Sequence, residues 1–386
     1  MKRLTTTPRK DWQKIVEKQG LLYHTIDGVP YWDESVYYSF TMDQVDEIEK
    51  ATGELHTMAL AAAQNIIDNK RYAQLQIPDF IIPLIEKTWN EEPPALYGRF
   101  DFSYDGKNPP KMLEYNADTP TSLLEASVIQ WYWMEDKFNK DQFNSIHDKL
   151  IAKFKSLKEY LYPGPVYFTA QDTWEDYMTI QYLRDCAEQS GLKIFGNKLT
   201  TESIRLEDVG WDSKDKVFID MDFKQIKNIF KLYPWEWMIH EEFGQHLLEC
   251  TDMFWMEPAW KMLLSNKGIL PVMWELYPNH PNLLEAYFDK PAHFARYAKK
   301  PLLSREGANV KLVTAQDTYR TPGEYGEEGY VYQQLAMLPN CDGKYPVIGS
   351  WMIDQEPAGM GIRESDGPIT DNFSRFVPHI IDGCCR

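Results

Sequence analysis

Two kinds of connection between predicted strands divide this sequence. Residues 165–170 (PVYFTA) predict a strand, Thr173 and Asp176 begin a helix that runs through Cys186, and residues 193–196 (KIFG) predict the returning strand. This spacing favours a parallel sheet, because parallel neighbours need a long crossover. The last third instead holds predicted strands joined by short turns, at 309–314, 329–335, 345–354 and 358–363. We therefore expect a mixed α/β fold in which a parallel α/β portion precedes a C-terminal antiparallel sheet.

Three helices are predicted ahead of the parallel portion. The first begins near Thr41, which has capping-box spacing with Gln44 and is followed by apolar residues at a helical period. Similar periods predict helices over 122–138 and 143–162. Because no internal repeat and no Gly/Ser-rich linker interrupts the 386 residues, we expect one closely packed unit. Its approximate lobes are 1–163, 164–255 and 256–386.

The charge composition argues against several classes of partner. The chain has 41 Lys and Arg against 58 Asp and Glu, a formal net charge of −17. This excess opposes nonspecific binding to nucleic acid and to anionic lipid. No apolar run approaches the roughly 20 residues of a membrane helix, and the N-terminus lacks the apolar segment of a signal peptide. The five cysteines form neither a disulfide framework nor a metal-binding pattern. We predict a cytoplasmic protein that acts on small molecules.

The segment 99–122 carries the most informative pattern for chemistry. Arg99 and Asp101 alternate with apolar neighbours, and so do Glu114 and Asn116. Side chains two apart share a strand face, so a hairpin of the two runs would bring these four side chains together. Three oxygen-bearing side chains suit Mg²⁺, and the arginine would offer a fixed positive charge to a phosphate or an oxyanion. The alternative is a solvated hairpin face with incidental salt bridges.

Basic residues recur at guarded positions in the last third. Lys267 follows a predicted helix, and Lys300 precedes a loop that carries Arg305 and Gly307. Lysines can bind nucleotide phosphates, and a loop with small residues can close over them. Arg363 ends a predicted strand whose glycines allow the close approach of backbone or ligand. For each basic residue the alternative is an ordinary surface or strand-end charge. The sequence has no P-loop, dinucleotide-binding, zinc or nucleophile-elbow motif.

Several segments together resemble a known enzyme family. They are RFDF (99–102), EYNADTPTS (114–122), MEPAWKMLLSNKGILPVMWELYPNHPNLL (256–284), KKPLLSREGANV (299–310), VYQQLAMLP (331–339) and GIR (361–363). In this order, across residues 10–380, they resemble the glutathionylspermidine synthase family and, within it, the stand-alone bacterial acid–amine ligases. The resemblance implies an ATP-grasp fold. It also implies a reaction in which ATP activates a carboxylate as an acyl phosphate, which an amine captures with release of ADP and phosphate. In the founding enzymes the acid is glutathione and the amine is spermidine.

The resemblance also implies a role for each candidate residue. Two Mg²⁺ ions would lie at Asp101, Glu114 and Asn116, and developing charge would be stabilised by Arg99, Arg305 and Arg363. ATP would be held by Lys267, Lys300, Gly307, Gln333, Gln334 and Leu335. The two substrates would lie near Thr119, Thr121, Glu175 and Asp176. The metal-binding hairpin would thus belong to the first lobe, the acidic pair to the second, and the nucleotide site with its lid to the third.

This chain also departs from the family pattern. Bifunctional members carry an N-terminal amidase with a cysteine nucleophile, for which this chain has neither the room nor a suitable cysteine, so we expect no amidase activity. Glu306 and Ala308 stand where the founding enzymes have smaller or hydroxylated lid residues, and Glu364 stands where they have glycine. These changes leave the identity of the acid and the amine open.

Two alternatives are a non-catalytic ATP-grasp-derived protein that binds a peptide or a polyamine, and a glycoside hydrolase whose carboxylates are Asp101 and Glu114.

Overall fold

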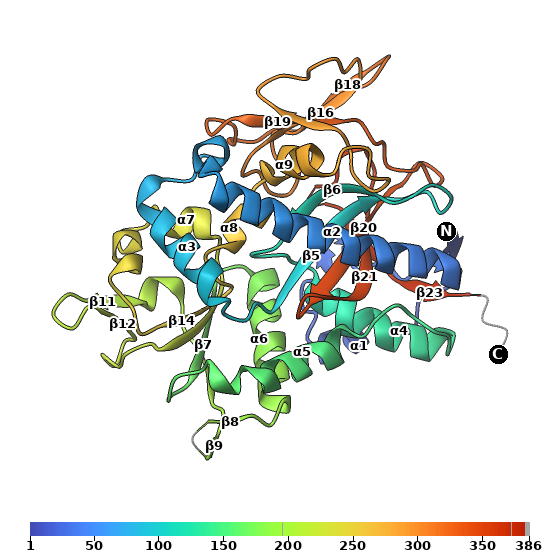
Figure 1. The fold of residues 1–386 in the computed structure, drawn as a ribbon. Helices are drawn as coiled ribbons and strands as arrows, with labels where there is room; N and C mark the ends of the chain where they lie inside the picture. The colour runs from blue at the N-terminus through green and yellow to red at the C-terminus, as the bar shows by residue number, and fades with distance from the viewer. Residues whose placement is uncertain (195, 372, 383–386) are drawn as a thin grey trace.

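The computed structural model describes residues 1–194, 196–371 and 373–382, and three sheets of four or five strands form its framework (Figure 1). The central antiparallel sheet has the order β22 (Arg375–Val377), β21 (Glu356–Ser365), β20 (Tyr345–Ile353), β5 (Tyr97–Ser103) and β6 (Lys111–Asn116). A parallel sheet has the order β10 (Thr201–Ser203), β7 (Val166–Ala170), β13 (Asn228–Leu232) and β14 (Phe254–Met256). The second antiparallel sheet has the order β15 (Ala286–Phe288), β19 (Tyr330–Gln334), β16 (Tyr297–Pro301), β17 (Lys311–Val313) and β18 (Thr318–Arg320). The predicted mixed α/β fold is confirmed.

Smaller elements surround these sheets. A three-stranded sheet joins β1 (Lys2–Thr5), β4 (Val36–Phe40) and β23 (His379–Ile381). Two-stranded ribbons pair β2 (Thr25–Ile26) with β3 (Val29–Pro30), β8 (Lys193–Ile194) with β9 (Asn197–Lys198), and β11 (Gly210–Asp212) with β12 (Val217–Ile219). The α-helices of the described residues are α1 (Trp12–Lys18), α2 (Met42–Asp68), α3 (Ile82–Glu91), α4 (Gln130–Lys137), α5 (Ile146–Ser156), α6 (Trp174–Gln189), α7 (Trp235–Met238), α8 (Lys261–Ser265) and α9 (Ile269–Leu276). Within the described residues, no helix is both long and apolar enough to cross a bilayer.

Helix α2 begins where the sequence predicts and covers one face of the central sheet. The Thr41 hydroxyl accepts a hydrogen bond from the Gln44 amide, and the Gln44 side chain accepts one from the Thr41 amide, which completes the capping box. Its His56 ring contacts the Tyr115 hydroxyl on β6 at 3.1 Å. Tyr115 in turn stacks on Phe100 of β5, with ring centroids 3.8 Å apart. The aromatic face of the hairpin is therefore buried against α2, and the alternate side chains point away from this helix.

The β5–β6 hairpin has the pairing that the alternation predicts. Arg99 lies opposite Asn116, and Asp101 lies opposite Glu114, before a register shift that follows Asp101. The hairpin is not a separate ribbon, because β20 pairs antiparallel with β5 and makes the hairpin part of the central sheet. Strands from the first third and from the last third of the chain thus share one sheet, and this fixes the backbone beneath Arg99 and Asp101.

The helices predicted over 122–138 and 143–162 form in part. The first is a π-helix over Glu125–Ile129 followed by α4, and the second is α5 followed by a 3₁₀ turn over Leu157–Glu159. A π-helical turn is rare and is often found at functional sites. The apolar period predicts that a helix forms here. It does not distinguish an α-helix from a π-helix, because both place the apolar side chains toward the protein interior.

The returning strand was predicted at the wrong place. Lys193 and Ile194 form β8, which pairs antiparallel with β9 across a turn at Gly196 (φ 86), and not with β7. Residue 195, within the predicted strand, lies outside the described residues. After the β8–β9 hairpin the chain continues into β10. Strands β10 and β13 both pair parallel with β7. The parallel sheet itself is confirmed.

A buried ion pair joins the hairpin to the parallel sheet. The Lys231 ammonium on β13 lies 2.7 Å from the carboxylate of Asp118, which follows β6, and both residues are fully buried. Asp118 also accepts a hydrogen bond of 3.0 Å from the Trp235 amide. The segment that leaves the hairpin toward Thr119 and Thr121 is thereby held against the parallel sheet.

Candidate functional site

A cleft between the β5–β6 hairpin and the second antiparallel sheet gathers most of the predicted site residues. Those that line it are Arg99, Asp101, Glu114, Asn116, Thr119, Thr121, Lys267, Lys300, Arg305, Gly307, Gln333, Gln334 and Arg363. They come from the hairpin and the segment that follows β6, from the turn between α8 and α9, from β16 and the loop after it, and from β19 and β21. The site is therefore assembled from the first and last thirds of the chain, whose strands share the central sheet.

Two arginines converge on Asp101. The Arg99 guanidinium bonds both carboxylate oxygens, at 2.7 and 3.2 Å, and donates a third bond of 2.6 Å to the carbonyl of Thr121. Arg363 bonds the same carboxylate from β21. Arg99 is 5% exposed and Asp101 is 3% exposed, so the alternative of a solvated hairpin face is wrong for this pair. Two cations around one buried carboxylate leave positive charge available to an anion in the cleft.

The glycines beside Arg363 admit protein and not ligand. A side chain at Gly361 would collide with the Phe376 ring, and one at Gly359 would collide with the Phe143 carbonyl. The sequence suggested that these glycines allow close approach of either backbone or ligand. In the structure it is neighbouring protein that approaches them. Arg363 is positioned because β21 packs tightly on those neighbours.

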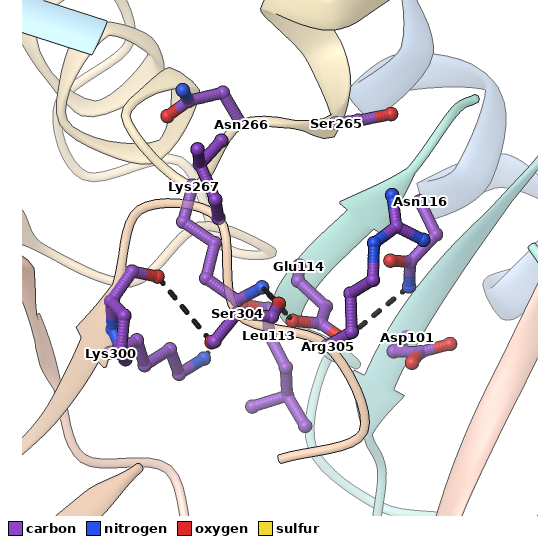
Figure 2. Close-up of polar contacts among 12 residues, drawn as sticks. Asp101, Leu113, Glu114, Asn116, Ser265, Asn266, Lys267, Lys300, Ser304 and Arg305 are labelled. Atoms are coloured by element: carbon purple, nitrogen blue, oxygen red, sulfur yellow. Dashed lines mark hydrogen bonds and ion pairs between the residues drawn. The ribbon is translucent and has the colours of Figure 1, made fainter. Parts of the chain in front are cut away.

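Glu114 lies between two lysines. Its carboxylate is 3.1 Å from the Lys267 ammonium. Figure 2 shows the Lys267 and Glu114 side chains directed toward each other. The Lys300 ammonium donates 2.8 Å bonds to the Leu113 carbonyl and to the Gln333 side chain. Burial would raise the pKa of Glu114, but the charges of Lys267 and Lys300 outweigh it and hold the pKa far below its usual range. Burial lowers the pKa of Lys300 to about 8, with Glu114 opposing that shift. Glu114 therefore stays ionised at neutral pH.

The loop after β16 closes over this end of the cleft. Arg305 donates bonds of 2.7 Å to the Thr119 hydroxyl and to the Glu236 carboxylate, and its guanidinium lies 5.4 Å from the Trp237 ring centre. Gly307 has φ 68, and an added Cβ would collide with the carbonyl of Thr370. Glycine is therefore needed at position 307 for two reasons, its backbone conformation and the closeness of that carbonyl.

One wall of the cleft is apolar. Ala298, Val310 and Leu312 form a small buried cluster, against which Leu335 and Ile369 pack. Gln333 lies opposite Ala298 in the sheet, is 1% exposed, and donates to the Met112 carbonyl at 3.2 Å. Leu335 thus supports the wall, while Gln333 and Gln334 reach the cleft itself. An apolar wall edged by amides and backbone groups suits a flat heterocyclic ring.

The acidic pair lies at the first turn of α6, which Thr173 caps. Glu175 contacts the Thr121 side chain, and the pKa of its carboxyl is raised to about 8 by burial and then by the nearby charges of Glu125 and Asp176. Burial also raises the pKa of Asp176 to about 6. Neither member of the pair lines the cleft itself; Glu175 adjoins it through Thr121, which does.

Sequence reasoning missed two carboxylates at this end. Glu125 is fully buried in the π-helix; the hydroxyls of Tyr23 and Tyr31 each donate a 2.6 Å bond to its Oε1, while its Oε2 has no hydrogen-bond partner. Glu306 lines the cleft beside Arg305. A glutamate within the apolar run LLEAS was a signal for the first. Glu306 appeared only as a departure from the family pattern, with no role assigned.

The hairpin donors fit a hard divalent cation only as a mixed set. Nowhere in the described ranges do three or more His, Cys, Asp or Glu side chains gather around one point, so an ion here would need the amide oxygen of Asn116 beside Asp101 and Glu114. Carboxylate and amide oxygens are the ligands that Mg²⁺ takes. In this structure the Asp101 carboxylate is paired with arginines and the Glu114 carboxylate with Lys267. If Mg²⁺ bound the carboxylate oxygens, the phosphates of a bound nucleotide would pair with the basic side chains that are released.

Comparisons with known proteins find relatives over nearly the whole chain. The family described as "Glutathionylspermidine synthase preATP-grasp" matches residues 3–382. A Haemophilus influenzae protein provisionally named an acid–amine ligase is 43% identical over 98% of this chain and 99% of its own length. Trypanothione synthetase of Crithidia fasciculata is 30% identical, and the bifunctional glutathionylspermidine synthetase/amidase of Escherichia coli is 28% identical. The matches cover 82% and 89% of this chain, but only 52% and 59% of those two longer proteins.

A solved structure supports the fold independently of sequence. A glutathione synthetase-like effector from Globodera pallida superposes with a TM-score of 0.60 at 10% identity, covering 96% of both chains. At that identity the likeness concerns the fold, and it confirms the predicted ATP-grasp type. The match over nearly the whole length and the 43% identical relative identify the family. This chain belongs to the glutathionylspermidine synthase family.

Proposed function

We propose that this protein is an ATP-dependent acid–amine ligase. It would join a carboxylate to an amine as an amide, through an acyl phosphate, with release of ADP and phosphate. The observation that carries the proposal is the convergence of Arg99, Asp101, Glu114, Lys267 and Lys300 in one cleft. Family membership and the ligase relatives support the same class of reaction.

The nucleotide would occupy the side of the cleft toward the second antiparallel sheet. Its ring would lie along the apolar wall near Gln333, Gln334 and Leu335, and its phosphates would meet Lys267 and Lys300. Gly307 would bring backbone N–H groups close to the phosphates. Asp101, Glu114 and Asn116 would hold Mg²⁺, which neutralises phosphate charge and orients the triphosphate when it is bound.

Three arginines would act where negative charge develops. Arg99 and Arg363 flank Asp101 at the hairpin, and Arg305 reaches the cleft from the loop above Thr119. A carboxylate that attacks the γ-phosphate places additional charge on the transferred group, and fixed guanidinium groups stabilise that charge without rearranging. Their backbone supports are strands or a tightly bonded loop, so the positive charge is already in place before the reaction.

The acid and the amine would meet at the end of the cleft near Thr119, Thr121, Glu175 and Asp176. An amine nucleophile that arrives as an ammonium ion must lose a proton before it attacks the acyl phosphate. Burial and the neighbouring carboxylates raise the pKa of Glu175 to about 8, so its ionised form is a stronger base than an ordinary carboxylate and could accept this proton. The names of the relatives suggest a glutathione-like peptide as the acid and a polyamine as the amine.

The hydrolase alternative loses its support. A glycosidase needs one carboxyl group that is protonated at the working pH. Lys267 and Lys300 hold the pKa of Glu114 far below its usual range, and Asp101 is bonded by two arginines. Neither carboxylate suits the role of general acid, whereas both suit cation and phosphate binding.

The test is nucleotide turnover with Mg²⁺ and ATP across a grid of thiol peptides and amines, with product masses read directly. We expect ADP and phosphate only where an acid and an amine are both present, with a product heavier than either. Glu114→Gln should abolish this turnover. Tight polyamine binding without ADP formation from any pair would instead favour the non-catalytic binding protein.

A further inference from the structure

We infer that Glu236, on the short helix α7, is a positioning residue that fixes the guanidinium of Arg305 for the reaction. This inference rests on the proposed function, because it concerns one of the three arginines assigned there to developing charge. It goes beyond that proposal, since Glu236 is not among the residues that line the cleft. Glu236 would act through Arg305 and would touch neither the nucleotide nor the acid.

The contact joins the loop after β16 to α7. The Arg305 guanidinium donates a 2.7 Å bond from Nη2 to the Glu236 carboxylate and a 2.7 Å bond from Nη1 to the Thr119 hydroxyl. The Glu236 side chain is 10% exposed and that of Arg305 is 26% exposed, so water screens this ion pair only partly. Burial disfavours the charge of Arg305, but Glu236 outweighs it, and the pKa of Arg305 is raised.

The Glu236 end of this contact is held rigidly by the residue before it. Trp235 is fully buried, and its indole donates a 3.1 Å bond to the carbonyl of Glu257. Its amide donates a 3.0 Å bond to Asp118, the carboxylate that also pairs with Lys231. Because this backbone is bonded to the parallel sheet and to the segment that leaves the hairpin, the place of the Glu236 carboxylate is set by the fold.

The Arg305 end of the contact stands in the loop between β16 and β17. In this loop the Lys267 ammonium donates a 2.5 Å bond to the Ser304 carbonyl, and the Ala308 amide bonds the Arg305 carbonyl at 2.8 Å. Under the proposed function Lys267 would turn to the phosphates of a bound nucleotide, which would weaken its bond to Ser304. The bond to Glu236 would remain, because it involves no group that binds nucleotide.

The two terminal nitrogens of Arg305 are thus bonded to protein, whereas the third nitrogen is not. Its Nε atom is buried and has no hydrogen-bond partner among the described residues. A buried N–H group is ordinarily satisfied, and Arg305 lines the cleft, so this donor is the one left for a ligand. With Glu236 and Thr119 fixing the plane of the guanidinium, Nε–H would meet an oxygen of the transferred phosphate or of the attacking carboxylate.

The test compares Glu236→Ala and Glu236→Gln with Glu242→Ala, at an exposed glutamate shortly after α7 that serves as the matched control. Steady-state kinetics with the acid–amine pair that supports turnover gives kcat and the KM for ATP. We expect Glu236→Ala to lower kcat about 30-fold and to change this KM less than about twofold, because the guanidinium loses its orientation while the nucleotide contacts remain. Glutamine keeps an acceptor for Arg305, so Glu236→Gln should stay within about fivefold of the wild-type kcat. The control should change neither quantity.

Hydrogen exchange measures the loop without turnover. The amides of Ala308 and Asn309 are bonded to the carbonyls of Arg305 and Pro322 at 2.8 and 3.0 Å, so they are protected while the loop is ordered. We expect Glu236→Ala and Arg305→Met each to speed the exchange of these two amides. The double variant should exchange no faster than either, since Glu236 acts through Arg305. An unchanged melting temperature would show that the fold is intact.

Three outcomes would overturn the inference. They are a wild-type kcat in Glu236→Ala, a loss in Glu236→Gln as large as in Glu236→Ala, and additive effects on exchange in the double variant. The first of these would leave the ligase proposal standing. Conversely, faster loop exchange in Glu236→Ala, with no ADP formed by the wild type from any acid–amine pair, would contradict the ligase while supporting the hold of Glu236 on Arg305.

Discussion

Arg99 is a buried arginine whose replacement should affect the proposed reaction more than the stability of the fold. It is 5% exposed, and its guanidinium donates hydrogen bonds to the Asp101 carboxylate and to the carbonyl of Thr121. Truncation would leave Asp101 paired with Arg363, so the fold would not gain an unpaired buried charge. The effect of the change should therefore fall mainly on the reaction and less on stability.

Arg99→Ala should lower turnover about 10²–10³-fold while the affinity for ATP changes less than about threefold, because the charge is needed most as the acyl phosphate forms. Steady-state kinetics gives turnover, and equilibrium titration with ATP gives affinity. Equal losses in the two quantities would mean that Arg99 only binds nucleotide.

Glu175→Gln should change how stability depends on pH. Burial, Glu125, Asp176 and Glu306 raise the pKa of Glu175 from 4.5 to about 8, so the folded protein holds this proton where the unfolded chain has lost it. Its contribution to stability is complete below pH 4.5 and is lost as pH rises through about 8. When the pH is raised from 6 to 9, the melting temperature should therefore fall less in the variant than in the wild type. Thermal unfolding of both proteins at the two pH values measures this.

The same variant should bind spermidine more weakly, since it lacks the carboxylate that receives the amine. Asp176 has a pKa raised to about 6 and titrates in both proteins, so it does not account for a difference between them. Equal losses of melting temperature between pH 6 and pH 9 would contradict the assignment of the raised pKa to Glu175.

At the residue scale, local patterns predicted only part of the site. The period of two along the hairpin placed Arg99, Asp101, Glu114 and Asn116 on one face, because that period is a property of any strand. Glu125 and Glu306 were not predicted, since their position depends on a π-helical turn and on a left-handed loop residue. Neither conformation follows from the residue types alone.

At the scale of elements, the pairing of β20 with β5 decides the site. Gly349 of β20 lies opposite Asp101, and a Cβ there would come within 2.7 Å of the Arg99 side chain. The alternation predicted both strands, but no local pattern indicates that residues about 250 positions apart are neighbours. The same limit explains the wrong assignment of residues 193–196, where a turn at Gly196 sends the chain to another partner.

Gly349→Ala should displace Arg99 and lower turnover about tenfold or more, because about an ångström of misplacement is costly at a reacting group. Alanine is compatible with this strand, so the melting temperature should change little. Gly367→Ala, where an added Cβ would meet nothing within 4 Å, is the matched control. Wild-type kinetics in Gly349→Ala would show that Arg99 tolerates the shift.

On the scale of the whole molecule, a buried ion pair connects the parallel sheet to the cleft. Asp118 and Lys231 are both fully buried and 2.7 Å apart, and Asp118 lies just before the threonines of the site. Removing one partner would leave the other charged and unpaired in the interior. The three lobes expected from the sequence remain a proposal, but this contact links strands from the first two of them.

Lys231→Met should lower the free energy of unfolding by about 3–5 kcal/mol, the usual cost of an unpaired buried charge. Adding Asp118→Asn removes that charge and keeps a side chain at the Trp235 amide, so the double variant should recover at least about 1 kcal/mol. Chemical denaturation of the two variants measures both values. A double variant less stable than Lys231→Met would contradict this account of the pair.

The central claim is that ATP activates a carboxylate by phosphorylating it. The most direct measurement uses the acid–amine pair that supports turnover, with ¹⁸O in both oxygens of the reacting carboxylate, and analyses the released phosphate by mass spectrometry. An acyl phosphate requires one carboxylate oxygen to leave with the phosphate, so we expect one ¹⁸O in each phosphate formed. Phosphate without ¹⁸O, formed together with the amide, would contradict activation through an acyl phosphate.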